Sequence, residues 1–254
     1  MAELFGWEVK KKESDKAKSF VAPSDEEGTL DIAGGAGFFG QYLSYDKSAR
    51  NDYELVRKYR QTSENPECDQ AIEDIINEAI ISHEDQPSVS VSLNYVTFSD
   101  PIKKKIQDEF QLILQMLNWN NKSHEIFRRW YIDGRIYFHK MVDTDATKKG
   151  VLELRYIDPR KIRKVKEITK ENKKGSSVEL IKKVNDYYMY NDQGLQVSGG
   201  TQQGLKIAPD SITYVPSGLI DQNKGHILSY LHKAIKPVNQ LRMIEDSLVI
   251  YRVS

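Results

Sequence analysis

The stretch Phe127–Lys140, which reads FRRWYIDGRIYFHK, is where this sequence changes from helical to strand character. Its first half places large apolar residues at helical spacing, and Gly134 then supplies the residue type that most often ends a helix. The second half is rich in branched and aromatic residues, which favour strands. We therefore expect a helix from about Ser123 to Asp133 and a strand over residues 135–142.

Upstream of this stretch, apolar residues recur mainly with the period of a helix. The pattern predicts one helix over residues 52–62 and a second over Pro66–Ile81. A third helix is expected from Ser99 to Leu117, with serine as its N-cap. Between the second and third helices, residues 89–93 alternate between apolar side chains and serine, which predicts a half-buried strand.

Downstream of the stretch, short strand-like segments follow one another. Further strands are expected at 151–157 and near 162–168, 178–190, 205–207 and 212–215. Because the helices come first and the strands follow as a block, the pattern indicates an α+β fold and not alternating βαβ units. From about Gly225 helical spacing returns, and no capping residue follows before Ser254. We expect this last helix to be truncated and to continue in a longer protein.

The charge balance limits what the protein can bind. Lysine plus arginine and aspartate plus glutamate both number 37, so the formal net charge is zero. A protein that grips DNA tightly usually carries a basic excess, because each phosphate contact needs a cation. The balance therefore argues against tight, sequence-independent DNA binding, and it leaves room for weak contact with DNA that must slide.

Cysteine content and hydropathy indicate where the chain folds. Cys68 is the only cysteine, so no internal disulfide can form, which suits a reducing compartment. Residues 1–12 lack the long apolar core of a signal peptide, and no stretch has the length of a membrane span. We expect a soluble protein that is made in a cytoplasm.

The first 50 residues differ in composition from the rest. They contain six of the 15 glycines and few aliphatic runs, so we expect residues 1–50 to form a flexible arm. Gly35–Gly40 matches the dinucleotide pattern G-x-G-x-x-G, which requires a preceding strand and a following helix. The flanking residues favour neither element, so we interpret the match as part of the glycine-rich arm.

No catalytic, cofactor or metal site is predicted. Asp143 and Asp145 could hold a divalent cation, but the residues around them are typical of a solvated loop. The five histidines lack zinc-ligand spacing, and no phosphate-binding P-loop occurs. We expect a protein that is not an enzyme. A metal-dependent nucleic-acid-processing enzyme domain is the main alternative, and a small-molecule binding domain, which would need a large apolar pocket, is another.

The Phe127, Arg128, Arg129 and Trp130 run combines arginine with aromatic side chains. Such a mixture occurs at interface hot spots and at nucleic-acid surfaces. It is equally typical of an amphipathic helix with its aromatic residues in the core and its arginines in solvent. The sequence leaves the core and interface interpretations open.

Three long segments carry a resemblance to a known family. They are Phe127–Lys140, Glu153–Ile168 (ELRYIDPRKIRKVKEI) and Tyr230–Arg252 (YLHKAIKPVNQLRMIEDSLVIYR). Together with the Tyr59-Arg60 pair and the predicted helix at Pro66–Ile81, they make residues 51–252 similar to the portal protein of large contractile-tailed bacteriophages. The resemblance is to the N-terminal half of that protein.

The resemblance implies a subunit of a twelve-membered ring at one vertex of a capsid, without catalytic residues or cofactors. Such a ring nucleates capsid assembly and serves as the channel for double-stranded DNA during packaging and ejection. Its implied partners are the terminase large subunit, the major capsid and scaffold proteins, and the neck and tail proteins. The implied location is the portal vertex of the virion, after assembly in the host cytoplasm.

The resemblance also implies a division of the chain. Residues 51–232 correspond to an α+β wing domain, and residues 233–254 correspond to the start of the first stem helix, which lies beside the channel. The arm at residues 1–50 matches little of the family.

The predicted stem helix carries an apolar stripe whose spacing is informative. Its members are the candidate subunit-interface residues Leu231, Ile235, Val238, Leu241, Ile244, Leu248 and Tyr251. Their mean spacing is shorter than the ~3.6 residues of a helical turn, so the stripe drifts around the helix. A drifting stripe favours neighbours on two sides, as in a ring, over an ordinary helix folded back on its own domain. Pro237 is expected to begin a new helical run or to kink the helix near Lys236.

Overall fold

The structure is a computed structural model, and it describes most of the chain. The described residues are 3–4, 7–8, 29–34, 38–81, 88–143, 145, 150–172, 179–195, 204–221 and 226–253.

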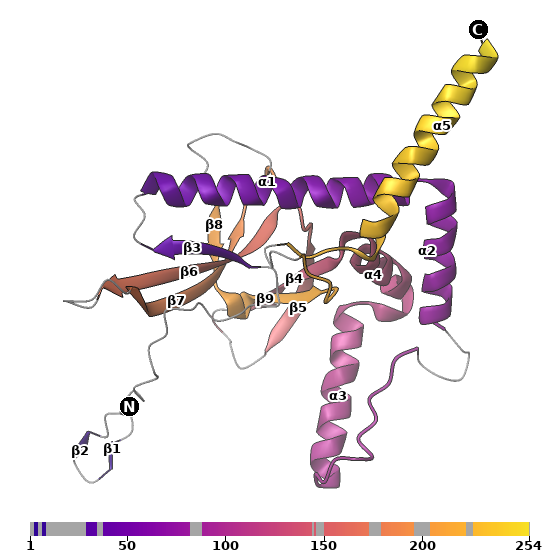
Figure 1. The fold of residues 1–254 in the computed structure, drawn as a ribbon. Coiled ribbons are helices and arrows are strands. Elements are labelled where there is room, and N and C mark those ends of the chain that lie inside the picture. Colours follow the sequence, from indigo (N-terminus) through magenta and orange to yellow (C-terminus); the bar gives the residue numbers. More distant parts are fainter. Residues whose placement is uncertain are drawn as a thin grey trace.

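Four helices precede most of the strands. They are α1 (Phe38–Ser63), α2 (Pro66–Ala79), α3 (Asp100–Met116) and α4 (Trp119–Asp133). Figure 1 shows α1 lying along the molecule, α2 turning away at its end, and α3 projecting in the opposite direction from the C-terminal helix. The α4 helix ends at Gly134, whose φ of 70° is the left-handed conformation that glycine adopts without strain.

The larger sheet has the strand order β3-β6-β7-β8. Its strands are β3 (Leu30–Gly34), β6 (Ile162–Asn172), β7 (Glu179–Tyr190) and β8 (Leu205–Ile207). The β3 strand pairs with β6 in parallel, and the other pairs are antiparallel.

A second, three-stranded sheet is antiparallel. It has the order β5-β4-β9 and consists of β5 (Val151–Ile157), β4 (Arg135–Val142) and β9 (Ile212–Pro216). Two short strands, β1 (Glu3–Leu4) and β2 (Trp7–Glu8), form a separate pair, and a 3-10 turn, η2 (Pro209–Ser211), leads into β9. Helices followed by antiparallel sheets confirm the predicted α+β class.

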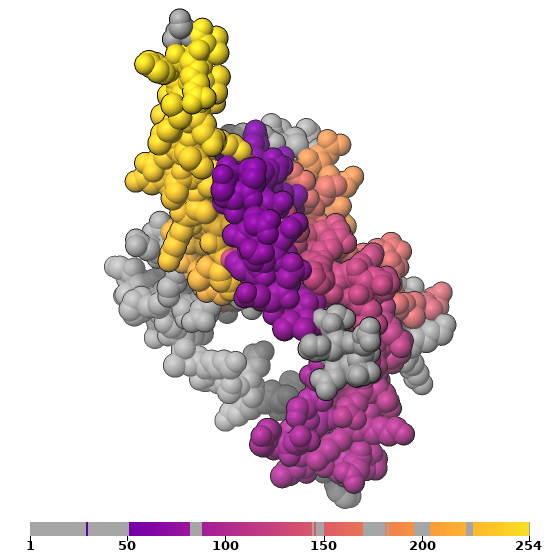
Figure 2. All heavy atoms as spheres, turned by 90° about the vertical axis from the view of Figure 1, so that its right-hand side faces the viewer, coloured from indigo at the N-terminus to yellow at the C-terminus, as the bar shows by residue number. Residues whose placement is uncertain are grey.

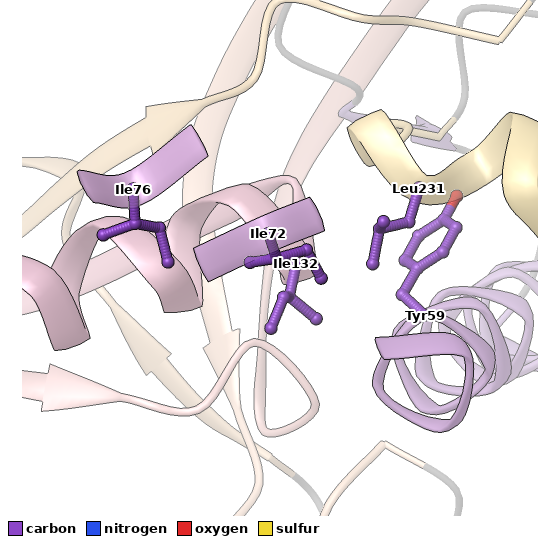
Figure 3. Close-up of a cluster of buried hydrophobic side chains, with 5 residues drawn as sticks. All are labelled: Tyr59, Ile72, Ile76, Ile132 and Leu231. Carbon is purple, nitrogen blue, oxygen red and sulfur yellow. The ribbon is translucent and has the colours of Figure 1, made fainter. Parts of the chain in front are cut away.

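The chain buries two separate hydrophobic clusters. The helical cluster contains Tyr59, Ile72, Ile76, Ile132 and Leu231 (Figure 3). The sheet cluster contains Tyr137, Ile162, Tyr188 and Ile212. The α4–β4 turn at Gly134 connects the two clusters, so the stretch that divides the sequence also joins the two packed regions.

The N-terminal segment differs from the prediction. The α1 helix begins at Phe38 and not near residue 52, and β3 adds a strand to the larger sheet, so the expected boundary at residue 50 falls inside a helix. Glycine is concentrated before Gln41, and no glycine or proline interrupts the chain from there to Ser63. Most of residues 1–28 lie outside the described residues, and the predicted mobility of the arm stays a prediction.

The strand and helix that the G-x-G-x-x-G pattern requires are therefore present as β3 and α1, although Gly35–Gly37 lie outside the described residues. The topology nevertheless differs from a dinucleotide fold. In a dinucleotide fold, the helix after the glycine pattern leads to a parallel strand beside the first strand. In this protein α1 leads into α2, and the parallel neighbour of β3 is β6, from much later in the chain.

Two further predictions differ from the structure. Residues 89–93 form no strand, although Val89, Val91 and Leu93 are half-buried and the serines between them are exposed. The alternation therefore predicted correctly which side chains face the protein, but among the described residues this segment has no neighbouring strand with which to form a sheet. The α4 helix begins at Trp119 instead of Ser123, after Asn118 in a left-handed conformation that asparagine tolerates.

Candidate functional site

The C-terminal helix α5 (Ile235–Val253) follows a short 3-10 segment, η3 (Tyr230–Ala234), and projects from the body of the protein (Figures 1 and 2). The change from 3-10 to α geometry occurs at Ile235, so Pro237 lies in the first turn. The expected new helical run near Lys236 is therefore confirmed. Proline is tolerated there because the amide groups of a first turn lack intrahelical partners.

The predicted stripe divides into two parts. Leu231 belongs to the helical cluster, Ile235 packs against it, and Val238 is only 9% exposed. Beyond Val238 the stripe residues are open to solvent, with exposures of 37% for Leu241, 59% for Ile244, 52% for Leu248 and 80% for Tyr251. The first part holds the helix on its own domain, and the second part makes no comparable burial within this chain.

Other apolar side chains surround the exposed part of α5. Met243, Val249, Ile250 and Val253 are also largely exposed. At about 100° per residue these positions and the stripe residues cover several sides of the helix. A contiguous apolar surface of this kind is unusual on a monomeric protein and generally marks an interaction surface.

The aromatic residues of the Phe127–Trp130 run form a cluster with the base of η3. Phe127 and Trp130 lie with ring centroids 5.5 Å apart, and Tyr230 lies 5.5 Å from Trp130 and 5.0 Å from Tyr131. Phe127 and Tyr131 also pack against the helical cluster. Phe127, Trp130 and Tyr131 are half-buried and Tyr230 is exposed, which places the cluster at the edge of the core.

The arginines of the same run form ion pairs with acidic side chains of α2 and α4. Arg128 forms an ion pair with Asp69 of α2, and Arg129 pairs with Glu125 one turn earlier in α4. The Arg129 guanidinium also lies 4.5 Å from the centroid of the Tyr156 ring. The run thus contributes aromatic packing on one side and half-exposed ion pairs on the other, and a role for it in subunit contact stays a prediction.

A buried charge network ties α1 to the strands. Asp52 lies 2.9 Å from Arg163 Nη1 and 3.4 Å from Arg135 Nη1, and its Oδ1 lies 2.7 Å from Nδ1 of His226. Burial alone would raise the pKa of the Asp52 carboxyl, but the two guanidiniums and the imidazole outweigh burial and lower it to about 2. The carboxylate therefore remains charged and compensates the two buried cations.

A second network lies at the other end of the α4–β4 turn. Arg60 donates to Asp133 at 2.9 and 2.7 Å and to Asp158 at 3.0 and 3.2 Å, and Arg160 also pairs with Asp158. Burial raises the pKa of Asp133 in spite of its two bonds from Arg60. Burial also acts to raise the pKa of Asp158, but the bonds from both arginines outweigh it and lower the pKa to about 2.

Neither network is predictable from the sequence alone. Asp52 lies 83 residues from Arg135 and 111 from Arg163 along the chain. Ionic residues of this kind are indistinguishable in a single sequence from the many charged residues at the surface. No local pattern pairs residues on a helix with residues on strands that come so much later.

One cavity of about 400 Å³ lies beside the second network. It is lined by Arg60, Glu125, Arg128, Arg129, Ile132, Asp133, Tyr156 and Asp158. Six of the eight lining residues are charged, and Arg60 and Arg129 pair with acidic side chains of the same lining, so the cavity is unlike the large apolar pocket of a small-molecule site.

The described residues contain no group of three or more histidine, cysteine, aspartate or glutamate side chains that could hold a metal ion. Asp143 accepts a hydrogen bond from the Asp145 amide at 3.0 Å, which is the geometry of a local turn. Among the residues that the structure describes, no helix is both long and apolar enough to cross a membrane.

The sequence is similar to known bacteriophage portal proteins. A family model described as the bacteriophage T4-like portal protein (Gp20) matches residues 52–254. The portal protein of Vibrio phage KVP40 is 35% identical over 263 residues, which is 97% of this chain and 50% of the relative. The portal protein of Salmonella phage ViI is 30% identical over 251 residues, which is 94% of this chain and 44% of the relative.

The chain therefore spans about half the length of these curated relatives. The matched region includes the α1 turns that carry Asp52, every strand of the two main sheets except β3, the Phe127–Trp130 run and all of α5. Because the family model covers most of the chain, this protein belongs to the bacteriophage T4-like portal protein (Gp20) family.

Proposed function

We propose that this chain supplies the wing and the start of the stem of a portal-ring subunit, in which α5 packs between copies of the same helix. The observation that carries the proposal is the exposed apolar surface of α5 beyond Val238, on several sides of the helix. A helix with neighbours on both sides in a closed ring needs such a surface. Residues 51–232 then act as the wing, and residues 233–254 act as the beginning of the stem.

The assembled ring has twelve copies at one vertex of the capsid, where it nucleates assembly. It docks the terminase large subunit, contacts the major capsid and scaffold proteins, and later binds the neck and tail proteins. Support for these partners comes from membership of the portal family, whose members are virion components. The ring assembles in the host cytoplasm.

Double-stranded DNA passes through the ring and is bound weakly. The equal numbers of basic and acidic residues support this part of the proposal, since many phosphate–cation contacts would slow a moving duplex. The protein acts as a conduit and has no catalytic turnover of its own. The alternative, a metal-dependent nucleic-acid-processing domain, predicts nuclease or nucleotide hydrolysis with divalent metal that disappears in an Asp143→Asn, Asp145→Asn variant.

The interface is tested by a Leu241→Asp, Leu248→Asp variant of the full-length protein. Both side chains are exposed in the isolated chain, so the change should leave the strand-rich domain folded. Ring formation should be lost, because each copy would bring two carboxylates into an apolar contact. Sedimentation velocity measures assembly, and circular dichroism measures folding.

A matched control is the Gln240→Glu, Ser247→Asp variant, which adds the same negative charge at exposed polar positions of α5. This control should retain more assembly than the leucine variant. Rings formed normally by the leucine variant, or a wing that unfolds in it, would show that α5 is not the intersubunit helix.

A further inference from the structure

Residues 226–232, which lead from the last loop toward α5, are named here the junction segment. It connects the body of the protein to the residues that begin α5. It contains no glycine or proline, and its sequence is HILSYLH. Hinges are generally short segments that absorb backbone rotation and make few contacts. The contacts of the junction segment show the opposite character.

The first half of the junction segment is held by α1, β4 and the turn after β9. His226 Nδ1 lies 2.7 Å from Asp52 Oδ1, and Arg135 Nη2 donates to the Ile227 carbonyl at 2.7 Å. The Leu228 amide donates to the carbonyl of Leu219 at 2.8 Å. The Leu228 carbonyl in turn accepts a bond of 2.6 Å from the hydroxyl of Ser217, which follows β9.

The second half is held by α4 and α1. Ser229 is buried, and its hydroxyl donates to the Tyr131 carbonyl at 3.1 Å while accepting from the Leu231 amide at 3.0 Å. Leu231 belongs to the helical cluster, and Figure 3 shows its side chain beside Tyr59. The Tyr59 hydroxyl lies 2.9 Å from Nδ1 of His232.

Tyr230 completes the set. Its ring stacks on Tyr131, and its hydroxyl donates to the Ser217 carbonyl at 3.1 Å. Each residue from 226 to 232 is thus hydrogen-bonded to the body, buried in it, or both. These contacts come from α1, α4, β4 and the turn after β9, so none of the residues from 226 to 232 is free to rotate relative to the body.

Gly134 permits this close approach. A Cβ added at Gly134 would lie 2.8 Å from the Leu228 carbonyl oxygen and 2.9 Å from two backbone atoms of Ser229. No such contact can be relieved by a side-chain rotation, because the opposing atoms are backbone. Gly134 therefore both ends α4 and makes room for the junction segment, so the same residue fixes the α-to-β switch and the path into α5.

We infer that the junction segment locks α5 to the body of the domain, so that wing and stem move as one rigid unit. A partner that displaces α4 or α1 must then displace α5 with it, since Tyr131, Asp52 and Tyr59 hold both sides of the connection. All of these contacts lie within one chain, so they do not depend on how many copies assemble.

The test is a distance measurement in the full-length protein by double electron–electron resonance. Spin labels are placed at Glu73→Cys on α2 and Gln240→Cys in the second turn of α5, both exposed, in a Cys68→Ser background. Labelled chains are diluted with excess unlabelled protein so that only distances within one chain are recorded. The parent should give a single narrow distance.

The Gly134→Ala variant should lose that narrow distance and give a broad distribution, because the junction segment is pushed off the body. Gly150→Ala is the matched control. Gly150 has a similar positive φ of 76°, but nothing lies within 4 Å of its added Cβ. It should keep the narrow distance, which separates loss of the junction contacts from strain at a left-handed residue.

A second variant covers the case in which Gly134→Ala fails to fold. Ser217→Ala combined with Ser229→Ala removes hydroxyls that bind the Leu228 carbonyl, the Tyr131 carbonyl and the Leu231 amide. It should broaden the distance and speed hydrogen exchange at Leu228 and Leu231. A broad distance in the parent, or a narrow one in folded Gly134→Ala or in the serine variant, would overturn the inference.

Discussion

The helices α2 and α5 both carry repeating apolar residues, but in α2 one face of them is buried, whereas in α5 most are exposed. In α2, Ile72 and Ile76 keep one face and are buried against α1 and α4. In α5 only Val238 is buried, and the apolar residues beyond it are spread around the helix. A stripe that holds one face indicates a partner within the chain, whereas a drifting stripe indicates partners outside it.

The α3 helix shows that a one-sided apolar stripe does not by itself imply burial. Its apolar residues also keep one face in the sequence, but the structure buries none of its residues, and Ile102 and Ile113 are 49% and 44% exposed. A regular stripe therefore gives the direction in which a helix faces, and burial depends on what the tertiary fold places opposite that face.

The largest effect is expected where α2 enters the helical cluster. Ile72→Ala should lower the free energy of unfolding by about 2–5 kcal/mol, because Ile72 is 1% exposed and its removal leaves a cavity. The matched control is Ile75→Ala on the same helix, where the side chain is 38% exposed. Urea denaturation measures both variants. Equal losses at the two positions would contradict the one-sided packing of α2.

A smaller effect is expected from the Asp52 network on acidification. The pKa of Asp52 is about 2 in the folded protein and 3.8 ordinarily, so the folded state binds its proton less readily than the unfolded state. The contribution of Asp52 is therefore complete above about pH 5 and is lost as the pH falls toward 2, by about 2 kcal/mol.

The Asp52→Asn variant checks this dependence. It should be less stable than the parent at neutral pH, and the difference in unfolding free energy should shrink between about pH 5 and pH 2. Chemical denaturation at several pH values measures it. A difference that stays constant across this range would mean that Asp52 is not the titrating group.

The smallest effect on stability is expected on α5. Ile244→Ala removes an exposed side chain, so the unfolding free energy of the unassembled chain should change by no more than about 0.5 kcal/mol. Assembly should weaken in the same variant, because the lost methyl groups lie in the proposed contact. A loss of stability comparable with that of Ile72→Ala would place Ile244 in the core of its own chain.

Much of the fold was predictable because its signals are local. The α2 helix, the end of α4 at Gly134, and β4 and β5 follow from periodicity and from one glycine. The early part of α1 and the β3 strand were not predicted, since β3 pairs with a strand more than 130 residues later. For the same reason, the alternation at residues 89–93 predicted a strand but could not show that no partner strand in the described part of the chain lies beside it.

The candidate site was predictable in outline only. The stripe on α5 follows from spacing, but its division at Val238 depends on how Leu231 and Ile235 meet the helical cluster. The junction segment has no sequence signature, because its contacts reach Asp52, Gly134 and Ser217 from separate parts of the chain. Only the fold brings these residues together.

The central claim is that neighbouring copies cover the exposed part of α5, and hydrogen exchange tests it most directly. Amide exchange of residues 241–253 is measured in the unassembled chain and in the assembled ring, with the α2 residues 66–79 as the internal reference. We expect residues 241–253 to exchange fast in the unassembled chain and to be strongly protected in the ring, with α2 protected in both. Equal exchange of 241–253 in the two states would contradict the claim.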